Sequence, residues 1–255
     1  MLRVCWLGQL AVVLLSTSAV ADVWNVDDDG ADFPGADFNT IQDAVDAADD
    51  GDTILVYPGT YTDTGVAVVD MMGKAVWLHS SDGPNTTIID GEDVRRGILS
   101  DSGETSKTII EGFTITNGYA SGFGGGMLID NSEATLLNCT FVNNHAVTGG
   151  GMLITEGNAT ITGCTFTNNT SLLYAAGMAC VGGVATLLDC TFENNSAKWV
   201  GGGMIIGEGA NATLVNCAFI GNTADLAGGG MFNETSTLTM TGCSFAGNVV
   251  SDGLG

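Results

Sequence analysis

The sequence predicts an all-β protein, a single-stranded parallel β-helix solenoid built from stacked coils of about 26 residues. A cysteine-centred segment recurs five times, at intervals of 25, 26, 27 and 26 residues. Each copy contains a Gly-rich step, a Met-led apolar strand and a Thr-rich strand, with Phe and Asn after the cysteine. Units of this length bury their apolar faces only against neighbouring units, so the repeat predicts a stacked architecture.

Equivalent positions of the five regular coils, residues 124–255, line up as columns. The columns are Met127, Met152, Met178, Met204 and Met231; Cys139, Cys164, Cys190, Cys217 and Cys243; Phe141, Phe166, Phe192, Phe219 and Phe245; and Asn144, Asn169, Asn195, Asn222 and Asn248. A corner precedes each cysteine, because Asn138, Gly163, Asp189, Asn216 and Gly242 tolerate a left-handed backbone. Three short strands, one such corner and one longer loop form each predicted coil.

Alternation along the strands predicts which columns face the core. The Met, Cys and Phe columns are expected to point inward. The same parity leaves an outward apolar stripe, which is a candidate contact surface. This stripe consists of Leu128, Leu153, Ala179, Ile205 and Phe232.

Residues 22–63 are predicted to form an N-terminal cap and the first strand. Ile41, Ala44, Val45 and Ala48 have the spacing of a short amphipathic helix. Asn39 is the expected N-cap, with Gln42 three residues on and Gly51 after the helix. Residues 53–57 read as a buried strand. Residues 64–123 contain less regular coils, so residues 22–255 are expected to form one domain.

Residues 1–21 have the features of a secretory signal peptide. Arg3 supplies a positive start, residues 4–15 are apolar, and Ala19-Val20-Ala21 resembles a cleavage site. We therefore expect a secreted or cell-surface protein, and the later sequence offers no integral membrane segment.

The charge balance excludes one class of partner. The chain carries 29 acidic and 6 basic residues, for a net charge of −23. Nucleic-acid affinity depends on neutralising phosphates, so no nucleic-acid partner is expected. Solubility, life in salt and divalent cation binding remain as explanations of the acidity.

The five column cysteines are expected to be buried, unpaired thiols. Stacked strands lie about 4.8 Å apart, whereas a disulfide needs Cβ atoms about 3.8 Å apart with a specific torsion. A zinc site is disfavoured because the sequence has no C-x-x-C and its two histidines, His79 and His145, lie in different contexts.

Several segments resemble known families. Residues 38–42, 51–54 and 58–61 resemble the N-terminal cap and first strand of the right-handed parallel β-helix, or pectin lyase-like, superfamily. The Gly-Gly-Gly-Met and Phe-x-x-Asn segments resemble the repeats of chlamydial-type polymorphic outer membrane proteins. The resemblance implies a right-handed helix, but this fold hosts lyases, hydrolases, esterases, adhesins and inert stalks.

The enzyme motifs of that superfamily are missing here. The segments typical of pectin methylesterases, pectate lyases, polygalacturonases and alginate epimerases do not occur, and Lys107 and Lys198 are the only cations after residue 96. We therefore expect no catalytic residues. A divergent polysaccharide lyase or esterase remains the alternative, with its site around residues 74–111, where Arg95-Arg96 adjoins Glu92-Asp93.

Two weaker features point to binding. Asp27, Asp29 and Asp32 resemble the start of a calcium loop, but the bidentate Glu at its twelfth position is missing. They are either calcium ligands or part of an exposed acidic N-terminus, and no other cofactor is expected. Phe123, Tyr174 and Trp199 lie in the longer loops, where they form either a sugar-stacking ridge or a cover over the loop base.

The sequence as a whole favours an exported, acidic, non-catalytic scaffold, similar to an adhesin, whose partner is a polysaccharide or another surface protein. A purely structural piece of a longer surface protein is a further alternative. Residues 224–255 show no capping segment, so we expect the last coil to be the least protected and to dock or to continue into further repeats.

Overall fold

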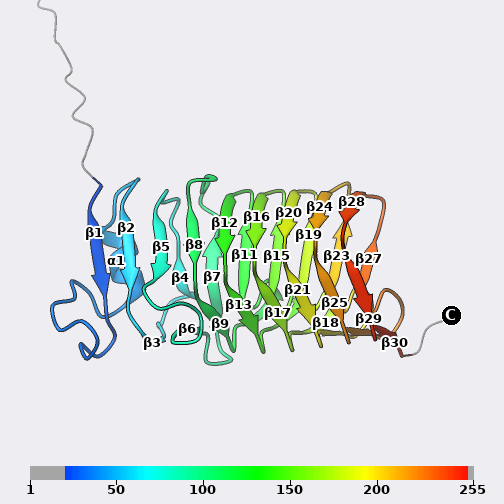
Figure 1. The fold of residues 1–255 in the computed structure, drawn as a ribbon, viewed down its shortest axis with the longest axis horizontal. Coiled ribbons are helices and arrows are strands. Elements are labelled where there is room, and N and C mark those ends of the chain that lie inside the picture. The colour runs from blue at the N-terminus through cyan, green and yellow to red at the C-terminus, as the bar shows by residue number, and fades with distance from the viewer. Residues whose placement is uncertain (1–20, 252–255) are drawn as a thin grey trace, which may run out of the picture.

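A computed structural model describes residues 21–251, so the predicted signal peptide lies outside the described residues, apart from Ala21. The chain winds into a solenoid with one short helix at its N-terminal end and strands stacked along a single axis (Figure 1). All strand pairs are parallel. The register is continuous between successive coils except for a shift within the β10–β14 and β14–β18 pairs. The described residues therefore form one continuous solenoid.

Four parallel sheets form the walls of the solenoid. The nine-stranded sheet contains β1 (Val23–Val26), β2 (Thr53–Val56), β5 (Trp77–Ser80), β8 (Ile109–Glu111), β12 (Glu133–Leu137), β16 (Asn158–Thr162), β20 (Val184–Leu188), β24 (Asn211–Val215) and β28 (Thr237–Thr241). The eight-stranded sheet contains β3 (Gly59–Tyr61), β6 (Thr87–Asp90), β9 (Thr114–Thr116), β13 (Thr140–Val142), β17 (Thr165–Thr167), β21 (Thr191–Glu193), β25 (Ala218–Ile220) and β29 (Ser244–Ala246).

The other two sheets complete each coil. The seven-stranded sheet contains β4 (Ala67–Asp70), β7 (Arg96–Ser100), β11 (Met127–Asp130), β15 (Met152–Thr155), β19 (Met178–Val181), β23 (Met204–Gly207) and β27 (Met231–Asn233). The six-stranded sheet contains β10 (Tyr119–Phe123), β14 (His145–Thr148), β18 (Thr170–Tyr174), β22 (Ser196–Ala197), β26 (Thr223–Ala224) and β30 (Val249–Val250).

The prediction of three strands and one left-handed corner per coil is wrong, because each regular coil has four strands. The predicted corner is present, with φ of 52° at Asn138. Further left-handed corners occur in the same coil at Asn131, Asn143 and Gly149, with φ of 47°, 57° and 67°. The corner at Asn143 separates the eight-stranded sheet from the six-stranded sheet. The sequence predicts the segment of the six-stranded sheet as a loop, and in β22, β26 and β30 its strands have only two residues.

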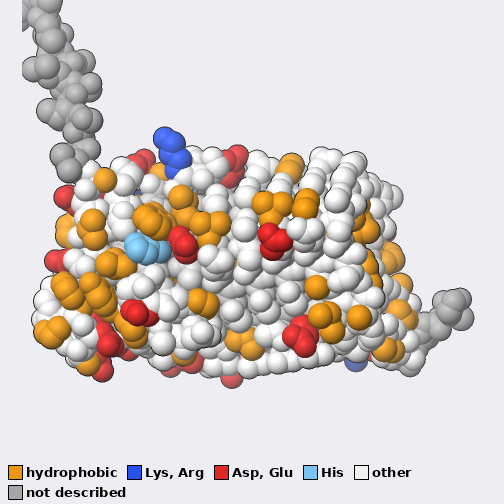
Figure 2. Space-filling view, viewed as in Figure 1, with side chains coloured by type: hydrophobic (Ala, Val, Ile, Leu, Met, Phe, Trp, Pro, Cys, Tyr) orange, Lys and Arg blue, Asp and Glu red, His pale blue; other side chains and the backbone are white. Residues whose placement is uncertain are grey.

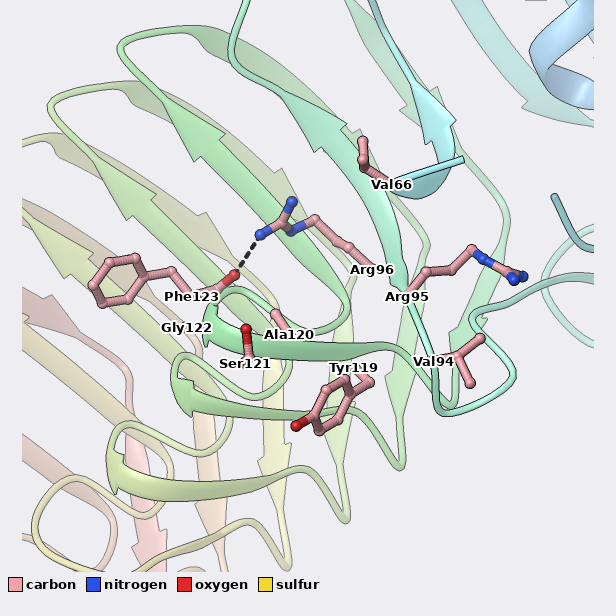
Figure 3. Close-up of a pocket in the computed structure, with 9 residues that line it drawn as sticks. All are labelled: Val66, Val94, Arg95, Arg96, Tyr119, Ala120, Ser121, Gly122 and Phe123. Atoms are coloured by element: carbon pink, nitrogen blue, oxygen red, sulfur yellow. Dashed lines mark hydrogen bonds between the residues drawn. The ribbon is translucent and has the colours of Figure 1, made fainter. Parts of the chain in front are cut away.

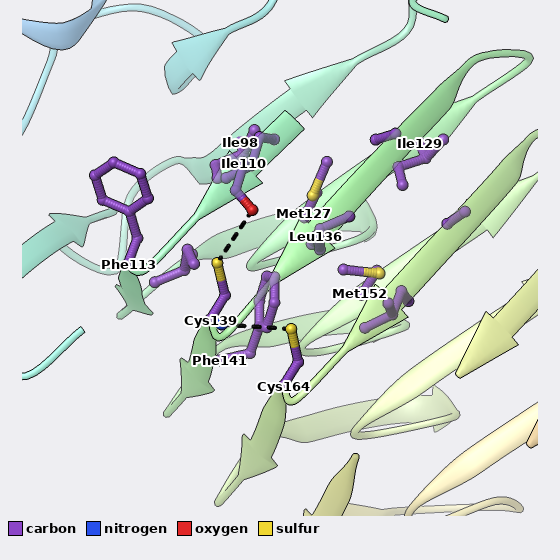
Figure 4. Packing of buried hydrophobic residues seen from close by; sticks show 14 of the residues in the cluster. Ile98, Ile110, Phe113, Met127, Ile129, Leu136, Cys139, Phe141, Met152 and Cys164 are labelled. Atoms are coloured by element: carbon purple, nitrogen blue, oxygen red, sulfur yellow. Dashed lines mark hydrogen bonds between the residues drawn. The ribbon is translucent and has the colours of Figure 1, made fainter. Parts of the chain in front are cut away.

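The inward columns fill the core as predicted. Met127, Met152, Met178 and Met204 are fully buried, whereas Met231 in the last coil is partly buried. The rings of Phe141, Phe166, Phe192, Phe219 and Phe245 form a continuous stack with centroid distances of 4.7–4.9 Å. Figure 4 shows how Met, Ile, Leu, Cys and Phe side chains of successive coils pack together. In the last described coil Phe245 is 48% exposed. The lower protection and docking of this end stay predictions.

The outward apolar stripe is not an exposed contact surface, so this prediction is wrong. Leu153, Ala179 and Ile205 are buried in a second small cluster together with Ala175 of the adjoining Gly-rich step. Leu128, Phe232 and Val200 pack at its edge. The chain between the six-stranded and seven-stranded sheets covers the stripe, which strand parity alone does not reveal.

The Asn column forms a buried ladder whose role the sequence analysis did not identify. Asn169 Nδ2 donates to Asn195 Oδ1 at 3.0 Å and to the carbonyl of Phe141 at 2.9 Å. The backbone N–H of Asn169 donates to the same Oδ1 at 3.0 Å. The pattern recurs from Asn144 to Asn248. Each amide therefore satisfies backbone groups at a corner that water does not reach.

The column cysteines are unpaired, as predicted. Cys139, Cys164, Cys190 and Cys217 are buried and Cys243 is partly buried. The backbone N–H of Cys139 lies 3.4 Å from Cys164 Sγ. Cys180, outside this column, is also a buried free thiol, and burial raises its pKa to about 11. The thiols act as small core side chains.

Helix α1 (Ile41–Ala47) buries Ile41, Ala44 and Val45, as predicted. It contacts β1, β2 and β4 and covers the N-terminal end of the core. Its N-cap is Thr40, which accepts a hydrogen bond from the backbone of Asp43, so the assignment of Asn39 is wrong. Gln42 instead bonds to the backbone of Asp70 through both of its amide atoms, and it ties the helix to the seven-stranded sheet.

Candidate functional site

The six-stranded sheet places the predicted aromatic residues on one outer surface. Phe123 pairs with Thr148, and Thr148 pairs with Tyr174, so Phe123 and Tyr174 belong to one column two rungs apart. Val200 continues this column through a bridge to Tyr174, and Trp199 directly precedes it. Two rungs correspond to about 10 Å. The parallel register therefore aligns three residues that lie up to 76 positions apart.

All three side chains are exposed to solvent. The exposed fractions are 56% for Phe123, 38% for Tyr174 and 41% for Trp199. The Tyr174 and Trp199 rings meet edge to face, with centroids 5.4 Å apart. Ala175 and Val200 pack over the loop base in the second cluster, which contains none of the three rings. We call Phe123, Tyr174 and Trp199 the aromatic row; its role as a ligand surface stays a prediction.

Sequence analysis missed a second exposed group on the same sheet. The Tyr119 ring stacks on His145 with centroids 5.8 Å apart and an interplanar angle of 15°. His145 Nδ1 lies 2.8 Å from Thr170 Oγ1 on the next strand. These residues share a detectable signal, because His145 and Thr170 each directly follow a ladder asparagine. Leu172 on β18 and Leu226, just after β26, are also about half exposed.

A hollow of about 380 Å³ adjoins the start of the aromatic row (Figure 3). It is lined by Val66, Val94, Arg95, Arg96 and residues 119–123. We call it the arginine hollow. It lies where β10 passes the start of β7, and Figure 3 shows the two arginine side chains diverging along its wall. The sequence predicted Arg95 and Arg96 either as a solvated charge cluster in a loop or as part of the site of a divergent lyase or esterase.

The two arginines are held differently. Arg96 donates from Nε to the carbonyl of Gly124 and from Nη2 to the carbonyl of Phe123, both at 2.8 Å. Burial lowers the pKa of Arg96, while the charges of Asp101 and Asp70 act in the opposite direction. An arginine nevertheless stays protonated in proteins. Arg95 forms an ion pair with Glu92 three residues earlier. Arg96 therefore brings a positive charge to the hollow, whereas the charge of Arg95 is paired with that of Glu92.

The acidic N-terminal segment does not group the predicted calcium ligands together. Carboxylate oxygens of Asp27, Asp28 and Asp29 lie within 4.8 Å of one another, whereas Asp32 is exposed outside this group. Burial acts to raise the pKa of Asp27, but backbone hydrogen bonds, including those from Phe33, Asp29 and Gly30, outweigh it and lower the pKa. The Asp27 carboxylate thus organises its own loop. Calcium binding at Asp27, Asp29 and Asp32 stays a prediction.

A family comparison agrees with this architecture. Residues 37–188 match the model described as the right-handed β-helix region. The chain belongs to this right-handed β-helix family. The match confirms the fold predicted from the repeats, while the similarity to polymorphic outer membrane protein repeats stays a prediction. No curated protein matches the sequence.

Solved structures with the same fold include two kinds of pectin-degrading enzyme. Pectate lyase Pel9A is 13% identical with a TM-score of 0.54, over 89% of this β-helix chain and 79% of that one. The pectin methylesterase from Aspergillus niger, in a deglycosylated form with a sugar stub, is 14% identical with a TM-score of 0.51, over 92% and 89% of the two chains. At this identity the likeness concerns the fold. Within residues 21–251, no helix has the length and apolar character that crossing a membrane requires.

Proposed function

We propose that this β-helix protein is an exported, non-catalytic scaffold that binds a polysaccharide along its six-stranded sheet. The observation that carries the proposal is the aromatic row, in which three rings are exposed across successive rungs at one side of the six-stranded sheet. Exposed aromatic side chains with an apolar face and, for Tyr and Trp, a polar group suit ligands that are partly apolar and partly hydroxylated. Sugar rings have this character.

The arginine hollow supports a preference for acidic sugars. Phe123 belongs to the aromatic row and also lines the hollow, so the two surfaces are continuous. A guanidinium group recognises a carboxylate through charge-assisted hydrogen bonds. Arg95 and Arg96 both line the hollow, and a uronic acid at the Phe123 end would lie close to the Arg96 guanidinium. We infer that the ligand is a polysaccharide whose chain carries carboxylate groups.

Calorimetric titration with uronic-acid oligosaccharides, and with neutral oligosaccharides of equal length, tests the proposal. We expect the acidic series to bind more tightly. Trp199→Ala and Tyr174→Ala should each weaken binding about two- to tenfold, since one aromatic contact contributes about 0.5–1.5 kcal/mol. Arg95→Gln should narrow the difference between the two series. Val184→Ala, which changes an exposed residue on the nine-stranded sheet, is the matched control.

Two results would contradict the proposal. The first is equal affinity of the Trp199→Ala variant, the Val184→Ala variant and the natural protein for the acidic series. The second is the appearance of cleaved or de-esterified products, which would favour the alternative of a divergent lyase or esterase near residues 74–111. Product analysis of the same samples by mass spectrometry separates these outcomes.

A further inference from the structure

A second hollow lies on the nine-stranded sheet, away from the aromatic row. Its volume is about 570 Å³, and it is lined by Asp50–Thr53, Ala75, Trp77, Thr105–Lys107 and Ile109. Figure 2 shows hydrophobic side chains and a histidine gathered over β2 and β5 on this face. Trp77 is 41% exposed on the outer face of this sheet. A large exposed apolar ring is a candidate contact site. We call this feature the Trp77 slot.

The indole of Trp77 is fixed in one orientation. His79, two residues on in the same strand, stacks against it with centroids 4.1 Å apart and an interplanar angle of 18°. The indole Nε1–H donates to Glu111 Oε2 at 3.1 Å. One face of the ring and its only polar atom are therefore occupied. Because His79 does not line the slot, the ring face that remains is the one that borders it.

Two loops form the walls of the slot on either side of Trp77. Residues 50–52 precede β2 and residues 105–107 precede β8, and these strands are the two neighbours of β5. The walls are therefore two rungs, or about 10 Å, apart. Asp52 anchors the first wall: its carboxylate accepts hydrogen bonds from Trp24 Nε1 at 3.1 Å and from the backbone of Asp49 at 2.9 Å. The slot is thus narrow and has a rigid side.

Each wall leaves polar groups free at the rim. Asp50 uses one carboxylate oxygen to accept from the backbone of Ala75 at 2.9 Å. Within residues 21–251 its other oxygen has no hydrogen-bond partner, and neither has Lys107 Nζ. An acceptor and a donor therefore flank the free face of one aromatic ring. Their charges cancel locally. Asp49 and Asp52 add negative charge beside the slot, and Lys74, whose charge helps to lower the pKa of Asp52, adds a second positive one.

We propose that the Trp77 slot binds a neutral pyranose unit of a sugar. The apolar face of the pyranose would stack on the free face of Trp77, and its hydroxyls would donate to Asp50 and accept from Lys107. The slot has no unpaired excess of positive charge, and the net charge of −23 on the molecule repels anions, so this slot selects against the carboxylate-bearing sugars that suit the arginine hollow. The proposal rests on residues of a different sheet from the aromatic row and is independent of it.

Nuclear magnetic resonance titration of the protein with neutral trisaccharides of glucose, mannose and galactose tests the slot, with trigalacturonate as the charged comparison. The probe signal is the indole Nε1–H of Trp77, assigned by its loss in Trp77→Phe. We expect at least one neutral trisaccharide to shift this signal and trigalacturonate to leave it unchanged. Asp50→Asn and Lys107→Gln, both exposed substitutions, should each weaken that binding at least threefold.

Trp199→Phe is the control, because it alters the aromatic row and leaves the slot intact. The proposal would be overturned if Asp50→Asn, Lys107→Gln and Trp77→Ala, all with the folded spectrum unchanged, each bound the neutral sugar as tightly as the natural protein does. An unshifted Trp77 signal with every neutral trisaccharide would also overturn it. Neither result bears on acidic sugars at Trp199, so the two proposals fail separately.

Discussion

The first coils and the regular coils of this solenoid differ in the length of the chain between successive strands. In the regular part, the corner between β11 and β12 has two residues, and so has the corner between β15 and β16. The chain between β7 and β8 has eight residues, 101–108. Unequal chain lengths on neighbouring rungs leave recesses, whereas equal lengths give flat walls. Both larger hollows are accordingly lined by residues up to Phe123.

The comparison indicates how a repeat protein divides its tasks. Five nearly identical coils stack Phe, Cys, Met and Asn in register, and their contacts repeat from rung to rung. In such a stack stability is roughly the sum of similar interfaces. The irregular coils give up this regularity and gain concave surfaces that hold exposed aromatic and charged side chains. The aromatic row joins the two parts, because it begins at Phe123 and continues over the regular coils.

Phe192→Ala in the middle of the ring stack should have the largest effect on stability. Its ring is fully buried between Phe166 and Phe219, with centroids 4.8 and 4.7 Å away. Loss of a buried phenylalanine costs about 3–5 kcal/mol. Denaturant unfolding measures this loss, and Leu226→Ala, which removes an exposed side chain, should cost under about 0.5 kcal/mol. Equal losses in the two variants would contradict the assignment of the core.

Asn195→Ala should follow closely, with a loss of roughly 2–4 kcal/mol, because each buried polar group left unsatisfied costs about 1–3 kcal/mol. Asn195 Oδ1 accepts from the side chain and the backbone of Asn169, and its Nδ2 donates to the carbonyl of Phe166. Asn211→Ala, which removes an exposed asparagine at the start of β24, is the matched control. A loss no greater than in that control would mean that the ladder contributes no stability of its own.

Asp52→Asn should weaken the N-terminal cap by about 1–3 kcal/mol at pH 7. Burial acts to raise the pKa of Asp52, but hydrogen bonds from Asp49, Asp22 and Trp24 outweigh it and lower the pKa. A lowered folded pKa adds stability above the unfolded value of about 3.9, and this stability is lost as the pH falls through the folded pKa. Unfolding curves of both proteins from pH 7 to pH 2 should therefore converge at acid pH. Parallel curves would contradict this assignment.

The smallest expected effect is a difference in thiol labelling rate between the last coil and the middle coils of the regular part. Cys243 is partly exposed, so it should react with iodoacetamide before Cys164 and Cys190. At pH 8, the raised pKa of Cys180 keeps that thiol neutral and unreactive in the folded state. Peptide mass spectrometry over time measures the order. Uniform labelling of the six cysteines within residues 21–251 would show that the last coil is no more open than the others.

The sequence allowed the regular coils to be predicted better than the sites. The repeat period shows which residues stack on one another. A shift of one residue in this alignment would have placed Met152 or Phe166 on the opposite face of its strand, so the alignment is well determined. The fourth strand of each coil was not predicted, because in several coils it has only two residues, as in β22, and so no detectable periodicity. The arginine hollow and the Trp77 slot depend on unequal loops on neighbouring rungs, and no pattern in the sequence aligns Arg96 with Phe123 or Trp77 with Lys107.

A crystal structure of the protein soaked with a uronic-acid oligosaccharide tests the central proposal most directly. We predict sugar rings against Trp199, Tyr174 and Phe123, with a carboxylate in the arginine hollow beside Arg96. Density for the oligosaccharide on another sheet, with the aromatic row empty at saturating ligand, would contradict the proposed binding surface.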